Sequence, residues 1–102
     1  REISKPGMSM HDLDDGVTKV LEDSAYKDFI VHKTGHGLGM DVHEDPYVMR
    51  KNYELLEKGM IITIEPGLYK DKHLGIRVED DVLITDKGCK SLTSFDRDLR
   101  VI

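Results

Sequence analysis

The sequence is poor in cysteine: its 102 residues include only Cys89, which excludes an intrachain disulfide. We therefore expect a cytoplasmic protein, because oxidising compartments are where disulfides persist. No apolar run approaches the roughly 20 residues of a membrane span, and no signal peptide opens the chain, so we expect no membrane partner. Basic residues are outnumbered, with 15 Lys and Arg against 20 Asp and Glu. A nucleic-acid partner is therefore not expected, since such partners usually meet a basic face.

The length suits one small domain or part of a larger one. The chain begins at Arg1 with no initiator methionine, which suggests a piece of a longer protein. No repeat, linker or low-complexity tract divides it, so we expect residues 1–102 to form one unit.

Residues 9–24 have the spacing of an amphipathic helix, with Ser9 in the N-cap position and Asp12 completing a weak capping box. Apolar residues at helical spacing are expected to form its buried face. These residues are Leu13, Val17, Val20 and Leu21.

Short runs of apolar and β-branched residues predict the strands. The expected strands are 28–32, 60–67, 75–85 and one within 87–93. Residues 53–59 suit either a single helical turn or a tight loop, and Gly67 and Gly75 suit a reversal between the two middle strands. One helix followed by four to six short strands predicts an α+β fold with a largely antiparallel sheet.

Two glutamates are expected on one face of this sheet. Pro66 biases Glu65 toward an extended backbone at the end of a strand, and Glu79 lies on the same strand face as Arg77. If residues 60–65 pair with 76–84 as a hairpin, the two carboxylates point into the same space. Their repulsion requires a proton, an arginine or a cation to offset it, and a metal ion would suit them.

Three of the five histidines lie in "HKTGHGLGMDVHEDP", residues 32–46. His36 stands between two glycines, which allow a tight backbone turn and the close approach of a ligand. Together with Glu65 and Glu79 it is a partial ligand set for a divalent cation such as Mn, Co, Zn or Fe. His43, seven residues later, could carry protons near neutral pH.

Each of these residues also has a more ordinary interpretation. A histidine in a glycine-rich loop is more often a turn or surface residue than a ligand. The acids around Glu79 would by themselves form a solvated edge, and Arg77 would be a surface arginine. Only the joint pattern favours a metal site.

That pattern resembles a known family. The ordered motifs "HKTGHGLGMDVHEDP", "GMIITIEPGLY" and "GIRVEDDVLIT" resemble the C-terminal half of the catalytic domain of the pita-bread metallopeptidases. The likeness runs from the helix at residue 9 to "FDRDLRVI" at the end. Glu79 follows Glu65 by only 14 positions and Arg77 by two, which favours the Xaa-Pro dipeptidases (prolidases) and Xaa-Pro aminopeptidases over methionine aminopeptidases.

The resemblance implies a dinuclear centre of divalent metal ions (Mn, Co or Zn) that activates water against the peptide bond before proline. His36 and Glu65 match ligands of one ion, and Glu79 matches the glutamate that bridges both. The implied substrate is an Xaa-Pro dipeptide or a peptide with proline at its second position.

The catalytic and substrate-binding roles are also carried over. His43 matches a histidine that contacts substrate and shuttles protons, and Glu65 would serve as general base. His32 and Arg77 match positions that bind substrate or support the ligands.

The family's centre has five protein ligands, and two of them are aspartates upstream of the helix that opens this chain. Only three ligands are therefore expected here, which implies a C-terminal fragment of the catalytic domain. We expect it to bind at most one ion and to be inactive alone. Its exposed apolar surface would favour a homodimer that imitates the two similar halves of the full fold.

Two other function classes stay open. A non-peptidase relative could use the same fold to bind protein partners, although such relatives usually lose the metal ligands. A creatinase-like relative could instead hydrolyse a non-peptide C–N bond.

Overall fold

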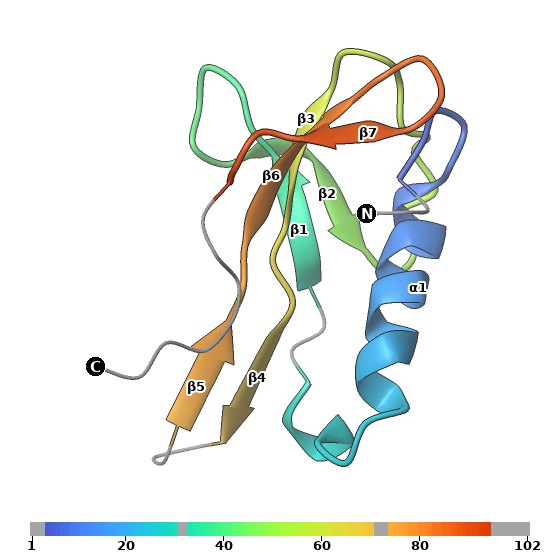
Figure 1. Cartoon of the computed structure of the whole chain (residues 1–102). Coiled ribbons are helices and arrows are strands. Elements are labelled where there is room, and N and C mark those ends of the chain that lie inside the picture. Colours follow the sequence, from blue (N-terminus) through green and yellow to red (C-terminus); the bar gives the residue numbers. More distant parts are fainter. Residues whose placement is uncertain (1–3, 31–32, 71–73, 95–102) are drawn as a thin grey trace.

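A computed structural model describes residues 4–30, 33–70 and 74–94. Figure 1 shows one helix lying along the side of a twisted sheet, from which a narrow two-stranded hairpin extends. In chain order the elements are α1 (Met10–Glu22), the 3₁₀ helix η1 (Lys27–Phe29), β1 (Lys33–Gly37), β2 (Glu44–Met49), β3 (Ile61–Ile64), β4 (Gly67–Lys70), β5 (Leu74–Arg77), β6 (Asp80–Ile84) and β7 (Cys89–Ser91).

The predicted helix is confirmed. The Ser9 hydroxyl accepts a hydrogen bond from the Asp12 amide at 3.0 Å, which caps the first turn. Its buried face was partly predicted wrongly, because Val20 is 71% exposed while Asp14 and Thr18 are buried. The buried stripe includes Asp14 because this carboxylate finds a hydrogen-bonding partner in the sheet.

The main sheet has the order β2-β1-β3-β6-β7, and every pair in it is antiparallel. Helix α1 packs on β1 and β2, with the core between helix and sheet. The buried core side chains are Met10, Leu13, Val48, Leu56, Ile62, Ile64, Val82 and Ile84. Burying each large aliphatic side chain stabilises the fold by about 1.5–3 kcal/mol, so this layer holds the sheet in place.

The smaller sheet continues a hairpin that begins in the larger one. The β3–β6 ladder ends with Ile64 opposite Asp80, and the β4–β5 ladder begins with Gly67 opposite Arg77. Two residues on each strand separate the ladders, so the register passes through the interruption unchanged. The predicted strands 60–67 and 75–85 are thus each split in two.

The interruption falls at the two predicted glutamates. One side is Glu65–Pro66, where proline has no amide hydrogen for a ladder bond, and the other is Val78–Glu79. A longer contact of 3.4 Å from the Val78 amide to the Pro66 carbonyl oxygen spans the gap.

Three further predictions were wrong in detail. Residues 27–29 form η1 rather than part of a strand, and residues 31–32 lie outside the described ranges. The strand instead begins at Lys33, so the glycine-rich segment expected to turn is β1. Gly67 and Gly75 lie opposite Arg77 and Tyr69 within β4 and β5, because a hairpin strand continues where a reversal was expected.

The other predicted segments agree with the structure. Residues 53–59 form a loop that ends in a turn, with Gly59 at a φ of 92°. The predicted final strand is β7. Within the described ranges, no helix is long and apolar enough to cross a bilayer.

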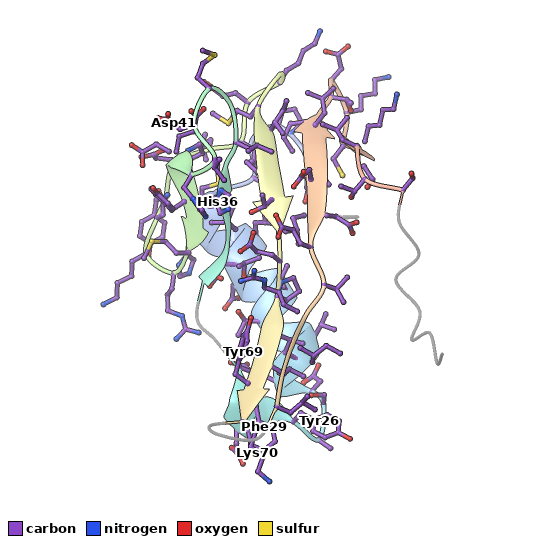
Figure 2. The ribbon with its side chains drawn as sticks, turned by 90° about the vertical axis from the view of Figure 1, so that its left-hand side faces the viewer. Tyr26, Phe29, His36, Asp41, Tyr69 and Lys70 are labelled. Carbon is purple, nitrogen blue, oxygen red and sulfur yellow. The ribbon has the colours of Figure 1, made fainter. Side chains whose placement is uncertain are left out.

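A β-bulge in β1 decides where its side chains point. Lys33 pairs with Met49 and Gly35 pairs with Val48, so Thr34 is an extra residue on this strand. Without the bulge, Thr34 and His36 would share a face. The extra residue reverses the alternation, so that the two side chains lie on opposite faces: Thr34 contacts α1, and His36 points away from it. In Figure 2, His36 lies in front of the sheet with α1 behind.

Gly35 is the close-contact point of this bulge. A Cβ atom at Gly35 would overlap the carbonyl oxygen of Thr63 on the neighbouring strand β3. We expect Gly35→Ala to lower the free energy of unfolding by about 1–3 kcal/mol or more, because the overlapping atom is backbone and β1 must move.

Gly88→Ala is the matched control, since a Cβ there meets nothing within 4 Å. The measurement is urea unfolding of both variants and the parent chain. Equal midpoints for Gly35→Ala and Gly88→Ala would contradict this account of the bulge.

Candidate active site

A cavity of about 390 Å³ opens beside β1, β3 and β6. It brings together every predicted site residue that the structure describes. Its lining residues are His36, Leu38, Val42, His43, Thr63, Glu65, Arg77, Glu79 and Asp81. His32 lies outside the described residues, so its predicted substrate contact stays a prediction.

His36 is the most constrained side chain of the cavity. It is buried on β1, and its amide donates to the Thr63 hydroxyl at 3.1 Å. Its ring atom Nδ1 lies 2.8 Å from the Gly37 carbonyl oxygen. Because a carbonyl oxygen only accepts, Nδ1 carries the proton and donates it there. In the neutral ring the lone pair is then on Nε2, which faces Glu65 in the cavity.

Glu65 meets that nitrogen. Its Oε2 atom lies 3.3 Å from His36 Nε2, and its Oε1 atom lies 3.7 Å from an Arg77 guanidinium nitrogen. Its backbone is tied to β1, because the Glu65 amide donates to the Thr34 carbonyl oxygen at 2.7 Å. The carboxylate is thus placed between an imidazole and a cation.

Glu79 lies across the interrupted hairpin from Glu65. Glu79 is exposed as a residue, but partial burial of its carboxyl raises its pKa from the ordinary value. Repulsion from Glu65 and Asp81 raises this pKa further, and a side-chain hydrogen bond with Glu65 adds to the rise. The Arg77 guanidinium opposes the rise. Glu79 therefore favours a bound proton or another positive charge.

His43 stands at the mouth of the cavity, immediately before β2. It is exposed, and its ring lies 4.3 Å from the His36 ring, centroid to centroid, at an interplanar angle of 46°. An exposed imidazole beside a buried one can exchange protons with solvent.

The predicted ligands are neighbours without forming a ready-made metal cage. Glu65 contacts His36 on one side and lies across the interrupted hairpin from Glu79, whose pKa it raises. Among the residues that the structure describes, however, no three or more His, Cys, Asp or Glu side chains are arranged to hold a metal ion.

Two polar residues of the cavity were missed from the sequence. Asp81 lies opposite Thr63 in the β3–β6 ladder, and both line the cavity. The strand alternation offered a signal, since Asp81 shares its parity with Glu79, and Thr63 shares its parity with Glu65. The apolar wall formed by Leu38 and Val42 had no comparable signal.

Comparison with known proteins shows what this arrangement is similar to. The model of metallopeptidase family M24 matches residues 1–86. An Xaa-Pro dipeptidase of Pyrococcus furiosus is 43% identical over 98 residues, which cover 96% of this chain and 28% of that protein.

Solved structures agree with the family match. The prolidase of Pyrococcus horikoshii OT3 has a TM-score of 0.90 at 41% identity, covering 97% of this chain and 28% of that one. The X-Pro aminopeptidase of Thermotoga maritima MSB8 has a TM-score of 0.92 at 35% identity, covering 98% and 28%.

These likenesses confirm the predicted α+β class and the pita-bread fold. The chain spans a little over a quarter of the length of the relatives it matches, 28% in each case given above. The chain belongs to metallopeptidase family M24.

Proposed function

We propose that this chain is the C-terminal part of the catalytic domain of a divalent-metal peptidase that cleaves the bond before proline. The contact between His36 Nε2 and Glu65 Oε2, beside a Glu79 carboxyl of raised pKa, carries the proposal. The names of the relatives, an Xaa-Pro dipeptidase and an X-Pro aminopeptidase, support the choice of substrate.

The donor atoms fit a cation. With its proton on Nδ1, His36 presents a nitrogen lone pair to a carboxylate oxygen 3.3 Å away. Two electron-rich atoms at this distance repel unless a proton or a metal ion lies between them. One imidazole and two carboxylates suit Mn, Co or Zn.

Bound there, a divalent cation would polarise the scissile carbonyl and lower the pKa of water. The side chains of this chain supply the rest. Glu65 can accept the proton of an attacking water, and Arg77 keeps the Glu65 carboxylate in place by its charge. His43, exposed at the mouth beside His36, can pass a proton to the departing proline nitrogen.

The remaining assignments concern the whole protein. We propose that Glu79 would be a ligand of both ions there. This chain alone would hold a single ion and not two, because its described residues offer no complete cage. Binding of substrate by His32, cytoplasmic localisation and a homodimer stay predictions.

Removing one of the paired carboxylates tests whether the site is strained without metal. We expect Glu79→Gln to raise the melting temperature of the metal-free chain at neutral pH, because it removes repulsion from Glu65 and Asp81. Thermal unfolding is followed in the presence of a chelator.

Glu57→Gln removes an exposed acid that does not line the cavity and serves as the control. A lower melting temperature for Glu79→Gln than for this control would show that the charge of Glu79 stabilises the metal-free fold. The repulsion proposed between Glu65 and Glu79 would then be wrong.

A chimera tests the function directly. This chain replaces the matched 98 residues of the P. furiosus enzyme, and hydrolysis of Ala-Pro and Ala-Pro-Ala is measured with Mn²⁺. We expect metal-dependent turnover that falls by about 10²–10⁴-fold with Glu65→Gln, the usual contribution of a positioned proton acceptor.

The two peptides separate dipeptidase from aminopeptidase specificity. The matched control is again Glu57→Gln, which should leave turnover unchanged. A folded chimera that hydrolyses neither peptide, or whose turnover survives Glu65→Gln, would overturn the proposal.

A further inference from the structure

A buried polar pair lies on the opposite side of the sheet from the cavity. Asp14 of α1 is 2% exposed, and Thr34 of β1 is 3% exposed. The Thr34 hydroxyl donates a hydrogen bond of 2.5 Å to Asp14 Oδ1. Neither residue lines the cavity, and neither takes part in the chemistry proposed above.

The backbone of Thr34 connects this pair to the active site. The Thr34 carbonyl oxygen accepts the Glu65 amide at 2.7 Å. Glu65 lies one residue beyond the β3–β6 ladder, in the interrupted part of the hairpin. The bond to Thr34 therefore fixes the Glu65 backbone where the partner strand β6 no longer does.

The bulge makes the connection direct. Because Thr34 is the extra residue of β1, its side chain turns toward α1 while its carbonyl group reaches Glu65, just beyond the end of β3. A run of hydrogen bonds thus leads from Asp14 through Thr34 to Glu65. His36, two residues along the same strand, aims its Nε2 atom at the same Glu65 carboxylate.

A simple packing role explains the pair poorly. Met10 and Leu13 already attach α1 to the core through apolar contacts. An apolar pair of similar size would attach the helix without burying a carboxylate, and such replacements are often neutral or stabilising. A directional hydrogen bond fixes the position of Thr34, which an apolar contact does less well.

We infer that Asp14 and Thr34 are positioning residues that hold Glu65 in place for metal binding. The inference rests on the proposed function for its consequence, but its structural part stands independently. The hydrogen bond keeps the bulge in one arrangement, and through the Thr34 carbonyl it holds the Glu65 backbone beside His36.

Amide hydrogen exchange in the metal-free 102-residue chain tests the structural part. The double variant Asp14→Leu/Thr34→Val removes both polar groups and leaves no unpaired buried charge. We expect exchange at Glu65 to accelerate about tenfold or more. The core amide of Ile84, which donates to the Met60 carbonyl oxygen, should change by less than about threefold.

Conservative variants show whether faster exchange at Glu65 comes from the lost hydrogen bond or from a change in packing. Asp14→Asn and Thr34→Ser keep a hydrogen-bonding group. In both variants the Glu65 amide should therefore exchange as slowly as in the parent chain. If the double variant does not fold, Thr34→Val against Thr34→Ser provides the same comparison. Unchanged exchange at Glu65, equal acceleration at Ile84, or loss of protection in both conservative variants would overturn the inference.

Mn²⁺ affinity, followed by electron paramagnetic resonance, tests the consequence. We expect the double variant to bind about tenfold more weakly, in the range typical of residues that support metal ligands, and Asp14→Asn to bind as the parent does. A parent chain that binds no Mn²⁺ would count against the proposed function, whereas the exchange experiment would still decide the positioning role. Equal affinity in parent and double variant would overturn the link to the metal site.

Discussion

The candidate site is built around two carboxylates, those of Glu65 and Glu79, which repel each other and which the fold keeps close together. Glu65 and Glu79 occupy the interruption of a long hairpin whose register is the same on both sides. The buried residues of β3 and β6 fix the backbone of this hairpin, so the two glutamates stay on opposite strands of the same interruption. Partial burial and repulsion from Glu65 raise the pKa of Glu79, and a bound cation would favour its charged form. The scaffold thus holds together two carboxylates whose repulsion the Arg77 guanidinium offsets only in part.

Strand β1 supplies His36, the imidazole that meets this acidic pair. Its bulge turns Thr34 toward the helix and His36 toward Glu65, and Gly35 lets the strand lie against the Thr63 carbonyl. The Nδ1 bond to Gly37 then sets the tautomer in which Nε2 meets the glutamate. The glycines around His36 therefore bring backbone close to backbone within a sheet, which a larger residue at 35 would prevent.

Much of this could be predicted from the sequence, because alternation along a strand is a strong signal. The parity of Glu65, Arg77 and Glu79 correctly placed them on one face, and Ser9 correctly marked the start of α1. Strand β1 was missed because glycine has low strand propensity and its neighbours suggested a turn. A bulge cannot be read from alternation, since it is defined by the partner strand. The burial of Asp14 was missed for a related reason: its partner Thr34 lies 20 residues away.

The most direct test of the account is a titration of the chelator-stripped chain with Mn²⁺, in which stoichiometry and affinity are measured by calorimetry. The account predicts one site, lost or strongly weakened in His36→Ala and Glu65→Gln and retained in Glu57→Gln. It would be contradicted if the parent chain bound no ion, or if binding were the same in all four proteins, because His36 and Glu65 would then not hold a metal.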